Sequence, residues 1–385
     1  MEIVSFFVET FKFTVFFFSF FALAAILYRR YFYTEKNKIY AVMKDTGIIN
    51  KRGKLPKVVD FKVEKGKVEY KLLPPYGISI EDFQNKFDKL EQSLNGEVKL
   101  LKEGSFIVLK VNKNPIPDYV EFEYISLPPG EVILGYSRDG PFKLRFSDEY
   151  PHMLVGGTTG SGKSVFLRQL IVQLLLSGNV DLYLIDLKFG VEFSVFRNSR
   201  YVKEYAENED DAFRVMLTIK ELTYKRFDEL KKSNAVNTEE YYMKPVFVIV
   251  DEFRNIMENK RLKSLFEELL RICRAVNIHF IIATQRPDKD TVPGSLKANI
   301  AMTCAFRTRD AVNSRILLEN DRAASIQIPG RFIFQFKDDI EMQSPFLSVE
   351  RARLLIKDTF VVKREKLSGV LDLANGEGYE DYSLY

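Results

Sequence analysis

The sequence is poor in the residues that build disulfide scaffolds and histidine-based catalytic centres. Its 385 residues include two cysteines, two histidines and no tryptophan. Cys273 and Cys304 are too few for a disulfide framework and fit a reducing compartment; both lie in apolar patterns, so we expect core or interface thiols. His152 and His279 alone argue against a polyhistidine metal site, and His279, which opens an apolar run, is expected to be structural.

Neither charge sign dominates the chain, and a mostly disordered protein is excluded. Lys and Arg number 57 against 53 Asp and Glu, a net charge of +4, while 46% of the residues are hydrophobic. This composition is globular. The charge balance neither identifies nor opposes a nucleic-acid partner. At about 150 residues per domain, the length suggests two domains and an additional segment.

An uncharged apolar run lies near the N-terminus, where Phe13 to Tyr28 read FTVFFFSFFALAAILY. Its helix would be about 24 Å long, short of a bilayer core of about 30 Å, so we extend it upstream to a helix over residues 10–28. Basic residues follow at 29, 30, 36 and 38, which favours a single-pass cell-membrane anchor (residues 1–39) with the remainder in the cytoplasm. The alternatives are a buried core helix and a signal peptide, although no basic segment precedes the run.

Residues 40–118 predict a small α+β module. A hairpin is expected around Lys65-Gly66, and Ser79 to Asp82 match a capping box that opens a helix. Two strand-like runs follow, and a proline-rich linker ends the module at residues 114–117. No catalytic constellation is visible there.

The strongest motif is a complete phosphate-binding loop, G-x-x-x-x-G-K-S, between a short apolar strand and a helical run. Its glycines allow backbone N–H groups to turn inward and, with the helix N-terminus, to hold phosphates. The side chain of Lys163 would neutralise the β- and γ-phosphates of ATP, and the hydroxyl of Ser164 would bind Mg²⁺. The nucleotide-binding residues are Gly157, Thr158, Thr159, Gly160, Ser161, Gly162, Lys163 and Ser164.

A second half-site is expected where Val246 to Val250 form a continuous apolar strand that ends in Asp251 and Glu252. Such a run is typical of a buried parallel strand, and ligands bind at its carboxyl end. Asp251 would hold the Mg²⁺ shell with Ser164, and Glu252 would polarise the attacking water as general base.

Two further strands, Asp181 to Leu187 and His279 to Gln285, alternate with helical stretches. This order predicts an α/β fold with a doubly wound, mainly parallel sheet over residues 119–362. Gln285 ends the strand after the acidic pair, where a group that senses the γ-phosphate is usually found. Residues 363–385 are rich in glycine and acidic residues and are expected to be a flexible tail.

These residues resemble the FtsK/SpoIIIE family of DNA-translocating ATPases over about residues 130–345. The resemblance rests on the phosphate loop from Gly156, on the strand that ends in Glu252, and on ATQRPDKDTVPGSLKANI at Ala283 to Ile300, the most specific block. It implies a RecA-like P-loop NTPase motor that forms a homo-hexameric ring around DNA and carries its ATP sites between subunits. A neighbour's arginine finger is then required, for which Arg274 is the first candidate and Arg271 the second; the alternative is that both are ordinary solvated arginines.

The resemblance also has departures. One candidate membrane span and one motor, with a tail too short for a winged helix, resemble the coupling ATPases of conjugative elements in Gram-positive bacteria. The expected function is then an ATP-driven DNA translocase that delivers relaxase-bound DNA to a transfer channel, with nicking left to a partner. The alternatives are a translocase for chromosome segregation or sporulation and a type VII-like protein-secretion ATPase. A non-hydrolysing scaffold is disfavoured by the intact Lys163, Ser164, Asp251 and Glu252.

Overall fold

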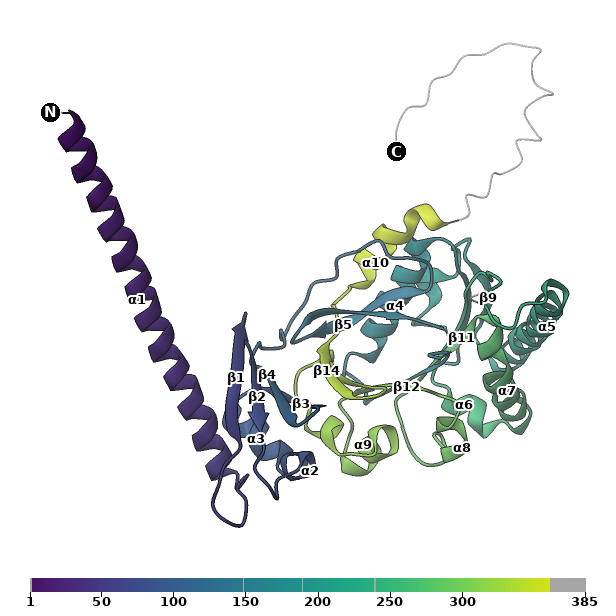
Figure 1. The fold of residues 1–385 in the computed structure, drawn as a ribbon. Helices are drawn as coiled ribbons and strands as arrows, with labels where there is room; N and C mark the ends of the chain where they lie inside the picture. Colours follow the sequence, from purple (N-terminus) through teal and green to yellow (C-terminus); the bar gives the residue numbers. More distant parts are fainter. Residues whose placement is uncertain (1, 148, 189, 239, 361–385) are drawn as a thin grey trace, which may run out of the picture. The chain divides into compact units, whose positions relative to one another are not determined.

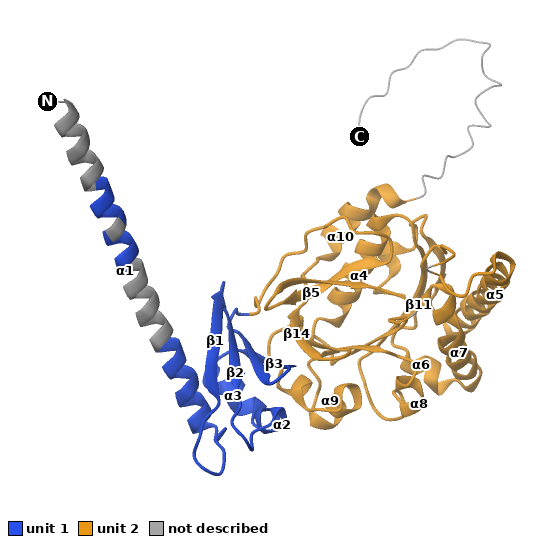
Figure 2. Cartoon of the chain, viewed as in Figure 1, with its two compact units in different colours: residues 1–115 blue, residues 116–385 orange. Residues whose placement is uncertain are grey.

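The computed structural model describes residues 2–147, 149–188, 190–238 and 240–360, and it divides into two compact units, residues 1–115 and 116–385 (Figures 1 and 2). The predicted tail, residues 363–385, lies outside the described residues. Each unit has its own hydrophobic core.

The first unit packs helices against an antiparallel sheet of order β1-β2-β4-β3. The end of α1 contributes Ile39, Val42 and Met43 to the core that this sheet forms with α2 and α3. The hairpin turn predicted at Lys65-Gly66 connects β1 to β2. The elements are α1 (Glu2–Asp45), β1 (Lys57–Glu64), β2 (Lys67–Leu73), α2 (Ile80–Gln84), α3 (Phe87–Leu94), β3 (Glu97–Glu103) and β4 (Phe106–Asn112).

The N-terminal helix is longer than the sequence analysis expected. It runs without a break from Glu2 to Asp45 rather than over residues 10–28, because no glycine or proline occurs before Gly47. The predicted span includes residues 10–12, 18 and 24–28, whose side chains lie outside the described residues. Over the parts of the chain that the structure describes, no helix has the length and apolarity needed to cross a membrane.

The second unit is built on a ten-stranded sheet of order β6-β5-β14-β13-β12-β7-β11-β10-β8-β9. The six strands from β12 to β9 are parallel, which confirms the predicted mainly parallel α/β sheet, whereas β13, β14, β5 and β6 extend it antiparallel. The strands are β5 (Glu131–Ser137), β6 (Gly140–Arg145), β7 (Met153–Gly156), β8 (Asp181–Asp186), β9 (Val202–Ala206), β10 (Val246–Asp251), β11 (Ile278–Thr284), β12 (Met302–Phe306), β13 (Arg331–Gln335) and β14 (Asp339–Gln343).

Helices cover both faces of this sheet, as Figure 1 shows. Alternate residues of β10 point to opposite faces: Val248 belongs to the core that includes residues of α5 and α7, while Phe247 belongs to the core that includes residues of α4 and α10. The doubly wound arrangement leaves the carboxyl edge of the parallel strands for loops. The helices are α4 (Lys163–Ser177), α5 (Glu209–Ser233), α6 (Arg254–Glu258), α7 (Lys260–Ile272), α8 (Gly294–Lys297), α9 (Ala311–Leu318) and α10 (Val349–Ile356), with short 3₁₀ turns η1 (Ser194–Phe196), η2 (Cys273–Val276), η3 (Arg322–Ser325) and η4 (Lys357–Thr359).

Candidate nucleotide-binding site

The phosphate-binding loop connects the carboxyl end of β7 to the start of α4. Gly160 and Gly162 have φ angles of 74° and 104°, which L-residues with a Cβ rarely adopt. The loop is held from outside, because Gly330 N donates to Ser161 O at 2.9 Å. A Cβ on Gly162 would lie 2.6 Å from Gly330 N, so only glycine allows this backbone approach. The path of the loop therefore depends both on its own glycines and on the contact with Gly330.

The structure brings the loop and the acidic strand end together. Lys163 Nζ donates to Asp251 Oδ1 at 2.9 Å, and the two side chains are only 3% and 1% exposed. The second oxygen, Asp251 Oδ2, is buried and has no hydrogen-bond partner among the described residues. This carboxylate oxygen and the hydroxyl of Ser164, the residue that follows Lys163, are the hard oxygen ligands that Mg²⁺ prefers. These residues fit the ion that the sequence predicts.

Glu252 follows Asp251 in an unusual backbone conformation. Its φ of 54° is left-handed, which for a non-glycine residue costs about 1–3 kcal/mol and is typical of functional sites. The carboxylate is oriented by Thr284, whose Oγ1 donates to Glu252 Oε1 at 3.3 Å. Since Thr284 is buried at the end of β11, the neighbouring strand fixes the direction of the Glu252 side chain.

Gln285 also reaches the loop. Its Oε1 accepts a hydrogen bond from Thr159 Oγ1 at 2.8 Å, and both residues line the pocket. The predicted position at the tip of β11 therefore places Gln285 beside the phosphate-binding loop.

Arg271 and Arg274 are not brought to this site. Both are exposed and lie at the end of α7 and in η2, immediately before β11 begins. Because β11 is parallel to β7 and has seven residues, its starting edge is about 20 Å from the edge that carries the phosphate loop. Neither arginine can contact the nucleotide of its own subunit, so a finger role requires a neighbouring copy.

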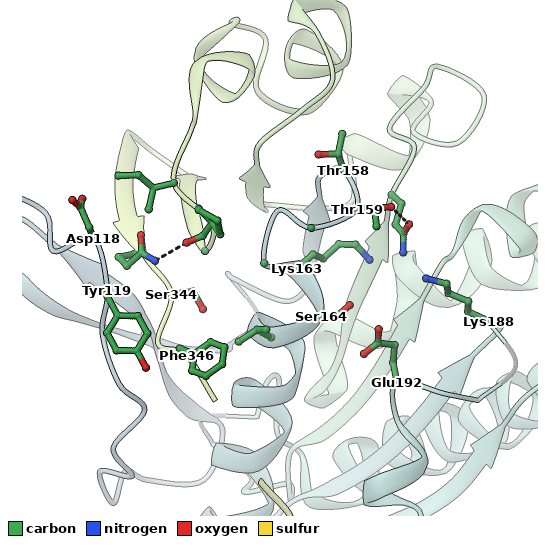
Figure 3. A pocket seen from close by; sticks show the side chains of 18 residues that line it. Asp118, Tyr119, Thr158, Thr159, Lys163, Ser164, Lys188, Glu192, Ser344 and Phe346 are labelled. Atoms are coloured by element: carbon green, nitrogen blue, oxygen red, sulfur yellow. Dashed lines mark hydrogen bonds between the residues drawn. The ribbon is translucent and has the colours of Figure 1, made fainter. Parts of the chain in front are cut away.

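A pocket of about 540 Å³ opens beside the loop. Figure 3 shows Lys163, Lys188 and Glu192 at one end of it and Tyr119 and Phe346 at the other. The two aromatic rings lie 5.9 Å apart, centroid to centroid. The cationic end matches a triphosphate and the aromatic end matches a nucleobase, and the volume is typical of a small-ligand site.

The aromatic end was not predicted from the sequence, because it is assembled from segments that lie far apart in the chain. Phe122 N donates to Phe346 O at 3.0 Å, and Phe346 N donates to Val120 O at 2.7 Å. The buried guanidinium of Arg331 holds the segment that carries Tyr119, because it donates a hydrogen bond to Asp118 Oδ1 at 2.9 Å. In the sequence, an aromatic residue, Tyr119, follows the proline-rich linker, but no pattern predicts that it lies beside Phe346.

Both histidines are buried and hydrogen-bonded, and a structural role was expected for His279. His152 Nδ1 accepts from Phe280 N at 3.0 Å, and its Nε2 lies 2.9 Å from Leu270 O. Burial lowers the pKa of His152 to about 4, and burial together with neighbouring His152 lowers the pKa of His279 to about 3. Burial likewise raises the pKa of Cys273 to about 12, so it is a protonated core thiol. None of the three side chains can exchange protons near neutral pH.

The fold and this site define a class of protein. A phosphate-binding loop between a buried parallel strand and a helix, close to the end of a second parallel strand that is followed by two carboxylates and separated from the first by one strand, is the architecture of a P-loop ATPase. Within that class, residues 127–244 match the model of the FtsK/SpoIIIE family.

Relatives and solved structures agree with that assignment. The chain is 27% identical over 396 residues to the DNA translocase FtsK of Leptospira interrogans (strain Fiocruz L1-130), covering 91% of this chain and 41% of that protein. It is 30% identical over 256 residues to the DNA translocase FtsK of Lactococcus lactis (strain IL1403), covering 59% and 33%. The chain therefore spans less than half the length of these relatives.

Among solved structures, the chain is similar to the monomer form of the pCW3 conjugation coupling protein TcpA with ATPγS. The TM-score is 0.59 at 25% identity, covering 84% of this chain and 99% of that one. The cytoplasmic domain of the type VII secretion ATPase EccC from Thermomonospora curvata gives a TM-score of 0.54 at 21% identity over 65% of this chain and 33% of that one, a likeness of fold.

Proposed function

We propose that this protein is a membrane-anchored, ATP-driven DNA translocase that couples relaxase-bound DNA to a conjugative transfer channel. The observation that carries the motor is the buried contact between Lys163 and Asp251, which joins the two halves of an ATP site; the phosphate-binding loop of that site lies within the residues that match the FtsK/SpoIIIE model. The conjugative role is supported by the likeness to a conjugation coupling protein, which extends over nearly all of that protein.

In the proposed reaction, phosphates displace the carboxylate of Asp251 from the ammonium of Lys163. Asp251 and Ser164 would hold Mg²⁺, which would supply positive charge beside the phosphoryl group. Glu252 accepts a proton from the attacking water, in the orientation that Thr284 gives it. Gln285, hydrogen-bonded to the loop through Thr159, responds to the terminal phosphate.

The proposed assembly is a homo-hexameric ring. Arg274 is the first candidate for the finger that completes a neighbour's site, and Arg271 is the second, because both are exposed and remote from their own nucleotide. Stabilising charge on the γ-phosphate from a neighbour would link hydrolysis to movement between subunits.

The membrane anchor is supported by α1. Among the described side chains of its first half, the phenylalanines are exposed, for example Phe13 and Phe16 at 70% and Phe20 at 61%. Exposed apolar side chains of this size are covered by lipid or by another protein. The basic residues that follow favour a motor in the cytoplasm.

ATP turnover of the full chain in mild detergent, with and without duplex or single-stranded DNA, tests the proposal. We expect DNA to raise turnover several-fold. Equal turnover in all three conditions would refute DNA as cargo and favour the type VII-like protein-export alternative. A chromosome-segregation translocase would also respond to DNA, and a relaxase gene adjacent to this one would favour conjugation over that alternative.

A further inference from the structure

The segment after β8 is held by a buried carboxylate. Asp186, the last residue of β8, is fully buried, and both of its oxygens accept backbone hydrogen bonds. Oδ1 accepts from Lys188 N at 3.2 Å, and Oδ2 accepts from Glu192 N at 2.9 Å and from Phe193 N at 3.0 Å. We name residues 187–188 and 190–193 the β8 arm. Three bonds to one carboxylate fix the path of this arm.

Two further hydrogen bonds connect the β8 arm to α6, which follows the acidic pair, and to β9. Asn255 Nδ2, three residues beyond Glu252, donates to Leu187 O at 3.2 Å. Tyr205 Oη donates to Gly190 O at 2.8 Å. The arm is therefore positioned both by its own strand and by the segment that carries the acidic pair.

The β8 arm delivers two charged side chains to the phosphate end of the pocket. Lys188 and Glu192 line it together with Lys163 and Ser164, and Figure 3 shows Lys188 directed toward this end. Glu192 is partly neutralised by Arg168 of α4, whose NH2 lies 3.8 Å from the Glu192 carboxylate. Within the described part of the chain, the Lys188 ammonium has no ion-pair partner.

We propose that the β8 arm is a second phosphate-binding element, in which Lys188 contacts the terminal phosphate of the nucleotide bound by its own subunit and Asp186 acts as the positioning residue. This inference rests on the proposed function, because it assumes a nucleoside triphosphate in the pocket. Lys163 is already paired with Asp251, whereas the ammonium of Lys188 is available for added negative charge. An unpaired ammonium beside a triphosphate forms charge-assisted hydrogen bonds, which are stronger than neutral ones.

Nucleotide binding separates this role from a purely structural one. We compare the affinities of the full chain for ATPγS and ADP, both with Mg²⁺ and without DNA. Lys188→Ala is expected to weaken the affinity for ATPγS by about tenfold or more, while the affinity for ADP changes by less than about twofold, because only ATPγS carries the terminal phosphate. Lys188→Arg should keep the preference for ATPγS. Lys225→Ala removes an exposed lysine on α5 and controls for loss of net charge. An equal loss of affinity for ATPγS and ADP, or no loss of affinity for either, would overturn the proposal.

The positioning role of Asp186 has its own test. Asp186→Asn keeps the shape but replaces one acceptor by an amide donor, which should reduce the ATPγS preference as Lys188→Ala does. In the double variant of Asp186→Asn and Lys188→Ala, the two losses of ATPγS preference should not add, because both substitutions act through the ammonium of Lys188. Additive losses would refute the positioning role. These binding assays contain no DNA, so they can still be interpreted if DNA does not stimulate ATP turnover. In the same way, a negative result for Lys188 leaves the test of DNA stimulation valid.

The claim that Lys188 acts within its own subunit is tested by mixing. Lys163→Ala and Lys188→Ala subunits are combined and ATP turnover is measured. If both lysines serve the same nucleotide of one subunit, no mixed site is complete and turnover stays at the level of the separate variants. Recovery of turnover would place Lys188 in the neighbour's site and overturn this part of the proposal.

Discussion

Replacing Lys163 by methionine should destabilise the second unit as well as block nucleotide binding. The change leaves Asp251, whose side chain is 1% exposed, as a buried carboxylate without the one partner that it has in the described part of the chain. Removing one member of a buried ion pair costs about 3–5 kcal/mol. For a unit of this size each kcal/mol lowers the unfolding midpoint by about 2–4 °C, so a decrease of roughly 10 °C is expected.

The assay is thermal unfolding followed by circular dichroism, without nucleotide. The double variant Lys163→Met, Asp251→Asn should lose less than the sum of the single variants, by about 1–3 kcal/mol, because it no longer buries an unpaired charge. Lys231→Met is the matched control: its pair with Asp228 is exposed at both ends, and surface pairs contribute about 1 kcal/mol or less. If Lys163→Met behaves like this control, the buried pair is not the stabilising contact that we describe.

Three further predictions concern pH, the nucleobase and the finger. His152 and His279 are neutral in the folded protein, with pKa values of about 4 and about 3, so the unfolded chain binds more protons than the folded chain below about pH 6.5. The free energy of unfolding should therefore be greatest above that pH and should fall by about 4 kcal/mol on reaching about pH 5. Tyr119→Ala should raise the KM for ATP about tenfold through lost stacking, while inhibition by tripolyphosphate is unchanged. Glu252→Gln subunits should bind ATP without hydrolysing it, and mixing them with Arg274→Ala subunits should restore part of the turnover.

Each of these has a control and a contrary outcome. His152→Gln, which does not titrate, should flatten the decline of the unfolding midpoint with pH, and an unchanged slope would contradict the histidine explanation. Tyr119→Phe should behave as wild type, and equal effects of Tyr119→Ala on ATP and tripolyphosphate would contradict a nucleobase contact. Rescue by Arg271→Ala subunits instead of Arg274→Ala subunits would reassign the finger, and normal turnover of Glu252→Gln would reject the assigned base.

The parallel part of the fold was predictable because its signals are local. Apolar strands such as Val246–Asp251 are buried on both faces and separated by amphipathic helices, so composition alone indicates a doubly wound sheet. The antiparallel extension was not predictable, because β5 pairs with β14, some 200 residues later in the chain. The length of α1 was underestimated because a helix ends at a breaker, not where its hydrophobicity ends.

Residues of the site divide in the same way. Lys163, Asp251 and Gln285 belong to contiguous motifs whose place on the sheet edge follows from strand order. Tyr119 and Phe346 meet only because two extended segments pair, and Lys188 is directed by three bonds to a carboxylate that looks like an ordinary strand end. Sequence patterns carry no information on such long-range placement.

The central claim is that the site joining Lys163 to Asp251 and Glu252 uses ATP to move DNA, and the most direct test is displacement of streptavidin from biotinylated DNA, duplex and single-stranded, by the full chain. We predict displacement by the wild type that requires ATP and is lost in Glu252→Gln. ATP hydrolysis without displacement on either DNA, or displacement that persists in Glu252→Gln, would contradict the account.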